Sequence, residues 1–156
     1  MHSKFLITLC FISVLYPTSF NAHTITTSAD HARSVFAVDM DKDGDIDVLA
    51  AINADTNLIW YENDGAQNFT EHVISDTAST VNTIYVADVD GDGDMDVLYS
   101  EFFYGIGWYE NDGSGNFTRY GISGGSMIRT VYAADVDGDG DMDVLSSSAG
   151  DDKIAW

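Results

Sequence analysis

Apolar and polar residues alternate along most of the chain in short segments of four to seven residues, separated by loops rich in Asp, Asn and Gly. The segments contain many β-branched and aromatic residues, as is typical of β-strands, and none shows a sustained helical period. We therefore expect an all-β protein. The expected strands are residues 34–38, 46–52, 58–62, 68–74, 83–87, 95–101, 106–110, 116–122, 130–134, 142–148 and 153–156.

The strand pattern repeats with a period near 48 residues. Three tryptophans mark this period: Trp60, Trp108 and Trp156. A complete period holds four short strands, which is the content of one β-propeller blade, so residues 23–156 are predicted to form a partial β-propeller of about three four-stranded antiparallel blades. The repeats are expected at about 30–76, 77–124 and 125–156. The third repeat has only three expected strands. Residues 23–25 resemble the fourth strand of a preceding blade and are predicted to complete a blade from the other end of the chain.

An acidic loop of nine residues, 39–47, follows the first expected strand. Five aspartates this close together repel one another, so the loop is expected to need a cation. Asp39, Asp41 and Asp43 occupy loop positions 1, 3 and 5, and a glycine follows at position 6, which is a calcium-binding pattern. Ala50 stands at position 12, where an EF-hand has a bidentate Glu, so this loop is not an EF-hand.

The same loop occurs twice more, at residues 88–96 and 135–143, each time followed by Val-Leu. Three copies with the same five aspartates favour a metal site over a solvated acidic turn. We therefore predict about three Ca²⁺ ions. The candidate metal-binding residues are Asp39, Asp41, Asp43, Asp45, Asp47, Asp88, Asp90, Asp92, Asp94, Asp96, Asp135, Asp137, Asp139, Asp141 and Asp143.

The formal net charge is -20, and 15 of the 26 acidic residues belong to these loops. Nucleic acids and anionic membranes are bound through basic patches, so neither is expected as a partner. The sequence contains no credible Ser-His-Asp set and no glycine-rich phosphate loop. We therefore expect no catalytic residues and no enzymatic activity.

Residues 1–22 have the features of a secretory signal peptide. Lys4 precedes an apolar run over residues 5–16, and small and polar residues follow. A buried N-terminal strand is the alternative interpretation. The apolar run is too short to span a bilayer, so no membrane insertion of the mature chain is expected. Cys10 is the only cysteine and lies in this segment, so the mature chain would have no disulfide.

The loops and the Trp-Tyr-Glu-Asn-Asp-Gly segments that begin at Trp60 and Trp108 resemble the FG-GAP-type repeats, in particular the VCBS-like branch related to the integrin α propeller. This resemblance implies a β-propeller whose loops hold Ca²⁺ between the first two strands of each blade. It also implies side-chain ligands at loop positions 1, 3, 5 and 9 and a carbonyl ligand at position 7. The name-giving Phe-Gly motif is replaced, for example by Phe36-Ala37, so the resemblance does not extend to integrin-like ligand recognition.

The expected function is that of a secreted or cell-surface calcium-binding β-propeller module that serves in binding or adhesion. The expected partner is a protein or a glycan. Aromatic residues at 102–104 are candidates for stacking on a sugar or a protein, or alternatively cover a blade interface. Two further alternatives are a fragment or non-catalytic appendage of a larger extracellular, carbohydrate-active enzyme, and self-association of copies to complete a propeller.

Overall fold

The computed structural model describes residues 21–53, 57–78 and 80–156, which form eleven β-strands. The strands are β1 (Ala32–Val38), β2 (Asp47–Ile52), β3 (Asn57–Asn63), β4 (Phe69–Ser75), β5 (Val81–Ala87), β6 (Asp96–Glu101), β7 (Gly105–Asn111), β8 (Phe117–Ser123), β9 (Ile128–Ala134), β10 (Asp143–Ser148) and β11 (Lys153–Ala155). Each predicted strand matches one of these to within two residues at either end, so the all-β prediction is confirmed. The predicted signal segment, residues 1–22, lies outside the described residues except for its last two.

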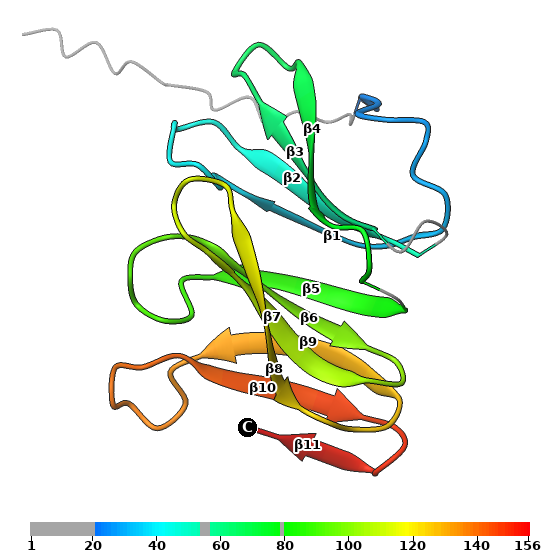
Figure 1. Cartoon of the computed structure of the whole chain (residues 1–156), viewed down its shortest axis with the longest axis vertical. Coiled ribbons are helices and arrows are strands. Elements are labelled where there is room, and N and C mark those ends of the chain that lie inside the picture. The colour runs from blue at the N-terminus through cyan, green and yellow to red at the C-terminus, as the bar shows by residue number, and fades with distance from the viewer. Residues whose placement is uncertain (1–20, 54–56, 79) are drawn as a thin grey trace, which may run out of the picture.

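The strands form three separate antiparallel sheets, which we call blades 1, 2 and 3. Blade 1 has the order β1-β2-β3-β4, blade 2 the order β5-β6-β7-β8, and blade 3 the order β9-β10-β11. Figure 1 shows the blades stacked face to face, from blade 1 at the top to blade 3 at the bottom. The arrangement is an open, partial β-propeller, as the sequence predicts. No helix able to cross a membrane occurs among the described residues.

Residues 23–25 do not form the predicted strand. They line a hollow on the outer face of blade 1, together with Val35 and Tyr61. The fourth strand of blade 3 would lie beside β11, by analogy with β4 and β8, and β11 is at the opposite end of the stack from blade 1 (Figure 1). Three blades do not bring the two ends of the stack together, so this strand pairing does not form within one chain.

The hydrophobic core lies between the blades. Leu49 and Trp60 of blade 1 pack in one buried cluster with Val97 and Tyr109 of blade 2. A second cluster joins blade 2 to blade 3 through residues that include Leu98 and Val131. Complete burial of one such aliphatic side chain contributes about 1.5–3 kcal/mol, so the blade interfaces account for much of the stability.

At one pair of facing residues, blade 2 has a large residue where blade 1 has a small one and a glycine where blade 1 has a large one, which we call the size exchange. In blade 1, Ala50 of β2 is paired with Ile59 of β3. In blade 2, the equivalent pair is Tyr99 of β6 and Gly107 of β7. A Cβ atom on Gly107 would lie 2.3 Å from the Tyr99 hydroxyl oxygen, so the large residue in one strand needs the small one in the other.

Candidate metal centre

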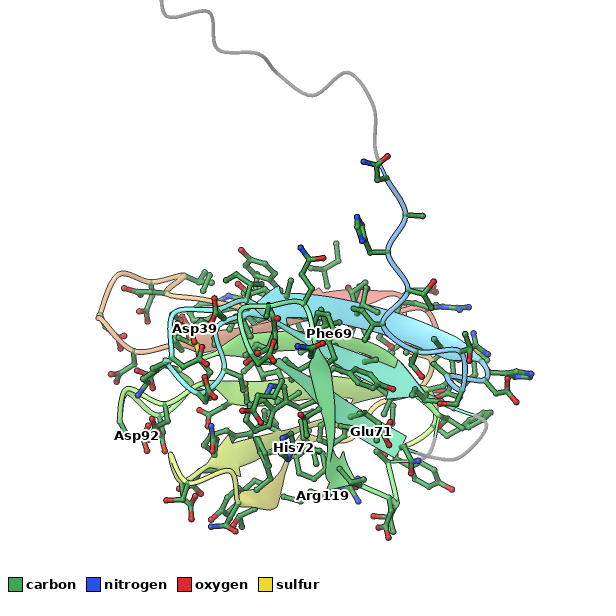
Figure 2. All side chains as sticks on the ribbon, turned by 90° about the horizontal axis from the view of Figure 1, so that it is seen from above. Asp39, Phe69, Glu71, His72, Asp92 and Arg119 are labelled. Carbon is green, nitrogen blue, oxygen red and sulfur yellow. The ribbon has the colours of Figure 1, made fainter. Side chains whose placement is uncertain are left out.

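The three aspartate loops connect β1 to β2, β5 to β6 and β9 to β10. All three lie along the same side of the stack, on the left in Figure 1. Each loop follows the first strand of its blade, because the glycines and aspartates interrupt the alternating strand pattern there. The blades therefore present the loops side by side, as Figure 2 shows from above for the loops that carry Asp39 and Asp92.

Three carboxylates converge in each loop. One oxygen from each lies within 4.8 Å of the other two. Ca²⁺ binds oxygen ligands at about 2.3–2.6 Å, so ligands on opposite sides of the ion are separated by about 5 Å. The spacing therefore fits one Ca²⁺ in each loop. The groups are Asp39, Asp41 and Asp43; Asp88, Asp90 and Asp96; and Asp135, Asp137 and Asp143.

Hydrogen bonds from the loop backbone to the first aspartates hold the carboxylates in this arrangement. The Gly44 N–H donates to Oδ2 of Asp39 at 3.1 Å, and the Asp43 N–H donates to Oδ1 of Asp41 at 3.1 Å. Gly44 has a φ angle of +98°, a left-handed conformation that glycine adopts without a steric penalty. The equivalent bonds of Gly93 and Gly140 recur in the other two loops.

Oδ1 of Asp39 is buried and accepts no hydrogen bond in the described part of the chain. A buried carboxylate oxygen without a partner is costly, because the group loses its hydration without replacement. A bound cation would supply the missing interaction. The residues present therefore fit a Ca²⁺ ion, which prefers carboxylate and carbonyl oxygens.

The aspartates at loop position 9 also hold the loop to the blade. Asp47 is fully buried, and its two oxygens accept backbone N–H groups of Met40 at 3.0 Å and Asn63 at 2.8 Å. In blade 2, Asp96 accepts the equivalent backbone N–H groups of Val89 and Asn111. Burial raises the pKa of Asp96 to about 6, against the opposing effect of these two hydrogen bonds. Each oxygen keeps lone pairs that are able to bind a metal, so the two roles are compatible.

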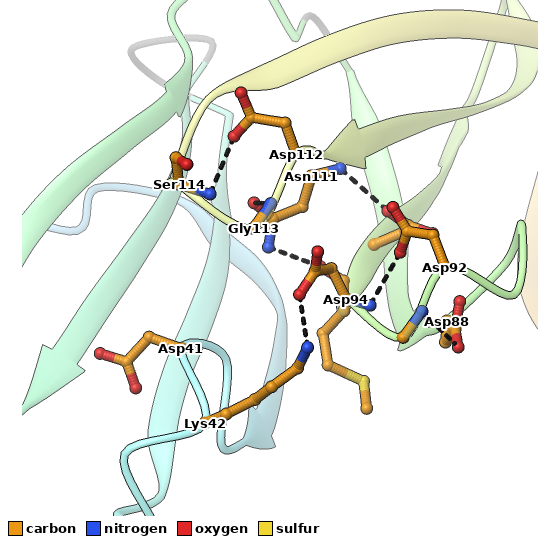
Figure 3. Close-up of polar contacts among 12 residues, drawn as sticks. Asp41, Lys42, Asp88, Asp92, Asp94, Asn111, Asp112, Gly113 and Ser114 are labelled. Atoms are coloured by element: carbon orange, nitrogen blue, oxygen red, sulfur yellow. Dashed lines mark hydrogen bonds and ion pairs between the residues drawn. The ribbon is translucent and has the colours of Figure 1, made fainter.

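The side chains at position 7 in the first two loops contact the neighbouring strand turns and do not join the carboxylate groups. Those of Asp45 and Asp94 lie against Gly65 and Gly113, where a Cβ atom would be only 2.4 Å from a carboxylate oxygen. The Asp94 carboxylate also accepts a hydrogen bond from the Lys42 ammonium of blade 1, as Figure 3 shows. This leaves the backbone carbonyl as the metal ligand that position 7 is able to offer.

The structure thus brings nine of the fifteen predicted aspartates into three groups of three. The remaining six lie in the same loops without joining a group: Asp45, Asp47, Asp92, Asp94, Asp139 and Asp141. The sequence reasoning missed the support from the β3–β4 and β7–β8 turns. Asn63 and Asn111 donate their side-chain amides to the carbonyls of Ile46 and Met95 at 3.1 and 3.2 Å. The recurring Asn-Asp-Gly sequence was the signal for this contact.

Burial raises the pKa of Asp41, and the neighbouring charges of Asp43 and Asp47 raise it further. By contrast, the hydrogen bond from the Asn68 side chain lowers the pKa of Asp64 in the adjacent turn. The turn carboxylate is thus stabilised by its own hydrogen bonds, whereas the loop carboxylate is surrounded by negative charge. A bound divalent cation would therefore stabilise the ionised carboxylates of the loop more than those of the turn.

The family comparison agrees with the geometry of these loops. A model of the FG-GAP-like repeat matches residues 39–99 and 101–146, more than half of the chain. The chain belongs to the FG-GAP-like repeat family. The first matched segment of this FG-GAP-like protein contains the loops at residues 39–47 and 88–96, and the second contains the loop at residues 135–143. The predicted resemblance is therefore confirmed.

A solved structure has a similar fold. It is that of an Agrocybe aegerita lectin, described for its specific recognition of non-reducing terminal N-acetylglucosamine. The TM-score is 0.55 at 18% sequence identity, and the match covers 72% of this chain and 32% of the lectin chain. The FG-GAP-like chain thus spans about a third of that lectin. No curated protein matches the sequence.

Proposed function

We propose that this FG-GAP-like chain is an extracellular binding module whose three aspartate loops hold structural Ca²⁺. The convergence of three carboxylates in every loop supports this proposal most directly. Asp39, Asp41, Asp43 and Asp47 would supply side-chain oxygens in the first loop, with the Asp45 carbonyl. The bound ion would neutralise the clustered charge and fix each loop at the edge of its blade.

Calorimetric titration tests the metal assignment. Three Ca²⁺ ions are expected to bind per chain, and each of the substitutions Asp39→Asn, Asp88→Asn and Asp135→Asn is expected to remove one of them. Asp30→Asn is the matched control, because Asp30 is exposed and lies outside the loops. A stoichiometry that stays at three in the loop variants would contradict the assignment.

We further propose that the module recognises a glycan or a protein and catalyses no reaction. The aromatic residues between β6 and β7 favour a binding role, since Phe103 and Tyr104 are 65% and 69% exposed. Exposed aromatic side chains on a connecting loop are suited to stacking on a sugar ring or a partner. The same role holds if the chain is a non-catalytic part of a larger extracellular enzyme. A glycan array probed in millimolar Ca²⁺ tests it, with Phe103→Ala as the binding-deficient variant.

Self-association of copies is a second proposal, favoured by the two end faces of the stack. On blade 3, Ile154 and Trp156 are 87% and 65% exposed, although their counterparts Leu58 and Trp60 are buried against the next blade. On blade 1, Val35 is 68% exposed, although its counterpart Ile84 is buried. The exposed apolar side chains of blade 3 in one copy are therefore suited to pack on the exposed face of blade 1 in another copy.

Light scattering in Ca²⁺ tests this packing. The purified chain is expected to show at least twice the monomer mass, and Ile154→Asp is expected to return it to a monomer. Tyr104→Asp is the matched control, because Tyr104 is also a large, mostly exposed side chain but lies outside the end faces. A monomer at all concentrations would exclude self-association.

A further inference from the structure

A cavity of ≈ 300 Å³ lies on the side of the stack opposite to the metal loops. It is formed where β1, β5 and β9 begin and where β2 and β6 end. Three of its residues stand at equivalent places in the repeats, six residues before the first aspartate of each loop: Arg33, Asn82 and Arg129. All three blades therefore contribute to one cavity, whose volume is at the lower end of those of small-molecule sites.

The cavity concentrates positive charge on a strongly acidic protein. Arg33 and Arg129 are two of only six Lys and Arg residues in the chain, whose net charge is -20. The ion pairs among the described residues involve Lys42, His72 and Arg119, so neither cavity arginine has a carboxylate partner there. A guanidinium offers several N–H donors in a planar fork that matches carboxylate and sulfate oxygens.

Aromatic rings form a wall beside this charge. The Arg129 guanidinium lies 5.2 Å from the centre of the Phe102 ring, and Phe103 packs edge-on against Phe102 with ring centres 4.7 Å apart. The Phe102 backbone is fixed on both sides, since its N–H donates to the Thr80 carbonyl at 3.1 Å and its carbonyl accepts the Met127 N–H at 2.8 Å. The aromatic wall is thus held in place before any ligand binds.

Two polar atoms in the cavity residues have no hydrogen-bond partner. Oδ1 of Asn53 and Oγ1 of Thr80 are both buried and unpaired in the described part of the chain. Asn82, by contrast, donates its side-chain amide to the Ile128 carbonyl at 2.7 Å. Unpaired buried acceptors are unfavourable unless a ligand hydroxyl or water donates to them. They are an independent sign of a ligand rich in hydroxyl groups.

We propose that this cavity binds a pyranose unit that carries an anionic group, either a carboxylate or a sulfate. Arg33 and Arg129 bind the anionic group, Phe103 stacks on the apolar face of the ring, and Asn53 and Thr80 accept ring hydroxyls. This assignment rests on the proposed glycan-binding function and specifies the class of sugar. Each metal loop, on the other side of the stack, carries five aspartates and stays net negative with one Ca²⁺ bound, so the loops do not compete for such a ligand.

Calorimetry in 1 mM CaCl₂ with small probes tests the assignment. The probes are methyl β-glucuronide, methyl β-glucoside 6-sulfate and the neutral methyl β-glucoside. At least one anionic probe is expected to bind, at least tenfold more tightly than the neutral one. Arg33→Gln and Arg129→Gln are each expected to weaken that binding tenfold or more, since hydrogen bonds to charged groups contribute about 1.5–3 kcal/mol. Phe103→Ala is expected to weaken both anionic and neutral binding.

Lys153→Gln is the matched control, because Lys153 is exposed on β11 and its loss removes the same charge outside the cavity. Unchanged melting temperatures of the arginine variants in Ca²⁺ establish that they fold. The inference is overturned if neither anionic probe binds, or if the arginine variants bind like Lys153→Gln. Binding of neutral glycans on the array, together with failure of both anionic probes, would leave the proposed glycan-binding function standing and remove only this inference.

Discussion

In excess EDTA the purified chain is expected to melt roughly 10–20 °C below its melting temperature in 1 mM CaCl₂. Three carboxylates within 4.8 Å of one another in each loop repel when no cation is bound. Extracellular sites bind Ca²⁺ with Kd values of about 10⁻⁴–10⁻³ M. At a Kd of ~0.1 mM, three independent sites contribute about 4 kcal/mol to the free energy of unfolding. Circular dichroism during heating measures the difference.

Two controls separate metal binding from a general effect of salt. Mg²⁺ at the same concentration is expected to restore much less of the stability, because it requires near-ideal octahedral geometry and gives up water reluctantly. The triple variant Asp39→Asn, Asp88→Asn and Asp135→Asn is expected to melt at the same temperature with and without Ca²⁺. Identical melting of the unmodified chain in EDTA and in Ca²⁺ would mean that the loops are not metal sites.

The second large effect concerns the size exchange between blades 1 and 2. Gly107→Ile is expected to lower the free energy of unfolding by about 2–3 kcal/mol, because the new Cβ meets the Tyr99 hydroxyl oxygen at 2.3 Å and the Tyr120 carbonyl oxygen at 2.6 Å. Tyr99→Ala alone is expected to cost about 3–5 kcal/mol, because it empties a buried site. It also removes the hydroxyl that accepts the hydrogen bond from Arg119 at 2.6 Å.

The double variant recreates the Ala50 and Ile59 pair of blade 1. It is expected to be more stable than the sum of the two single effects predicts, by about 1–3 kcal/mol, because the new side chain fills the space left by Tyr99. Urea unfolding of the four proteins measures this coupling. Gly121→Ala is the control: Gly121 is paired with Gly107 across the strands, and an added Cβ meets nothing within 4 Å. Strict additivity of the two single effects would refute the size exchange.

The sequence predicted the strands and the aspartate loops well because both depend on local patterns. Alternation along a strand, turn residues and the spacing of aspartates are each visible within about ten residues. The period near 48 residues then indicated that one unit recurs. Trp60 illustrates the value of the repeat, because it marks the period in the sequence and is buried between blades 1 and 2 in the structure.

The side-chain roles within the loops could not be predicted in the same way. Asp45 and Asp47 belong to one acidic run, yet one lies against Gly65 and the other holds the backbone of Met40 and Asn63. The turn that makes this difference lies 16 residues further along the chain from Asp47. Folding brings the turn after β3 close to the loop. The spacing of the aspartates in the sequence does not indicate which carboxylate contacts that turn.

The sequence by itself determined an all-β chain of repeated blades with clustered aspartates, because alternation and loop spacing are short-range properties. Only the tertiary structure decided which faces stay exposed at the ends of the stack and that Arg33, Phe102 and Arg129 share one cavity. These three residues come from different strands and loops, separated by up to 96 positions. Their proximity depends on how the blades stack, and stacking is set by long-range packing between sheets rather than by any local pattern.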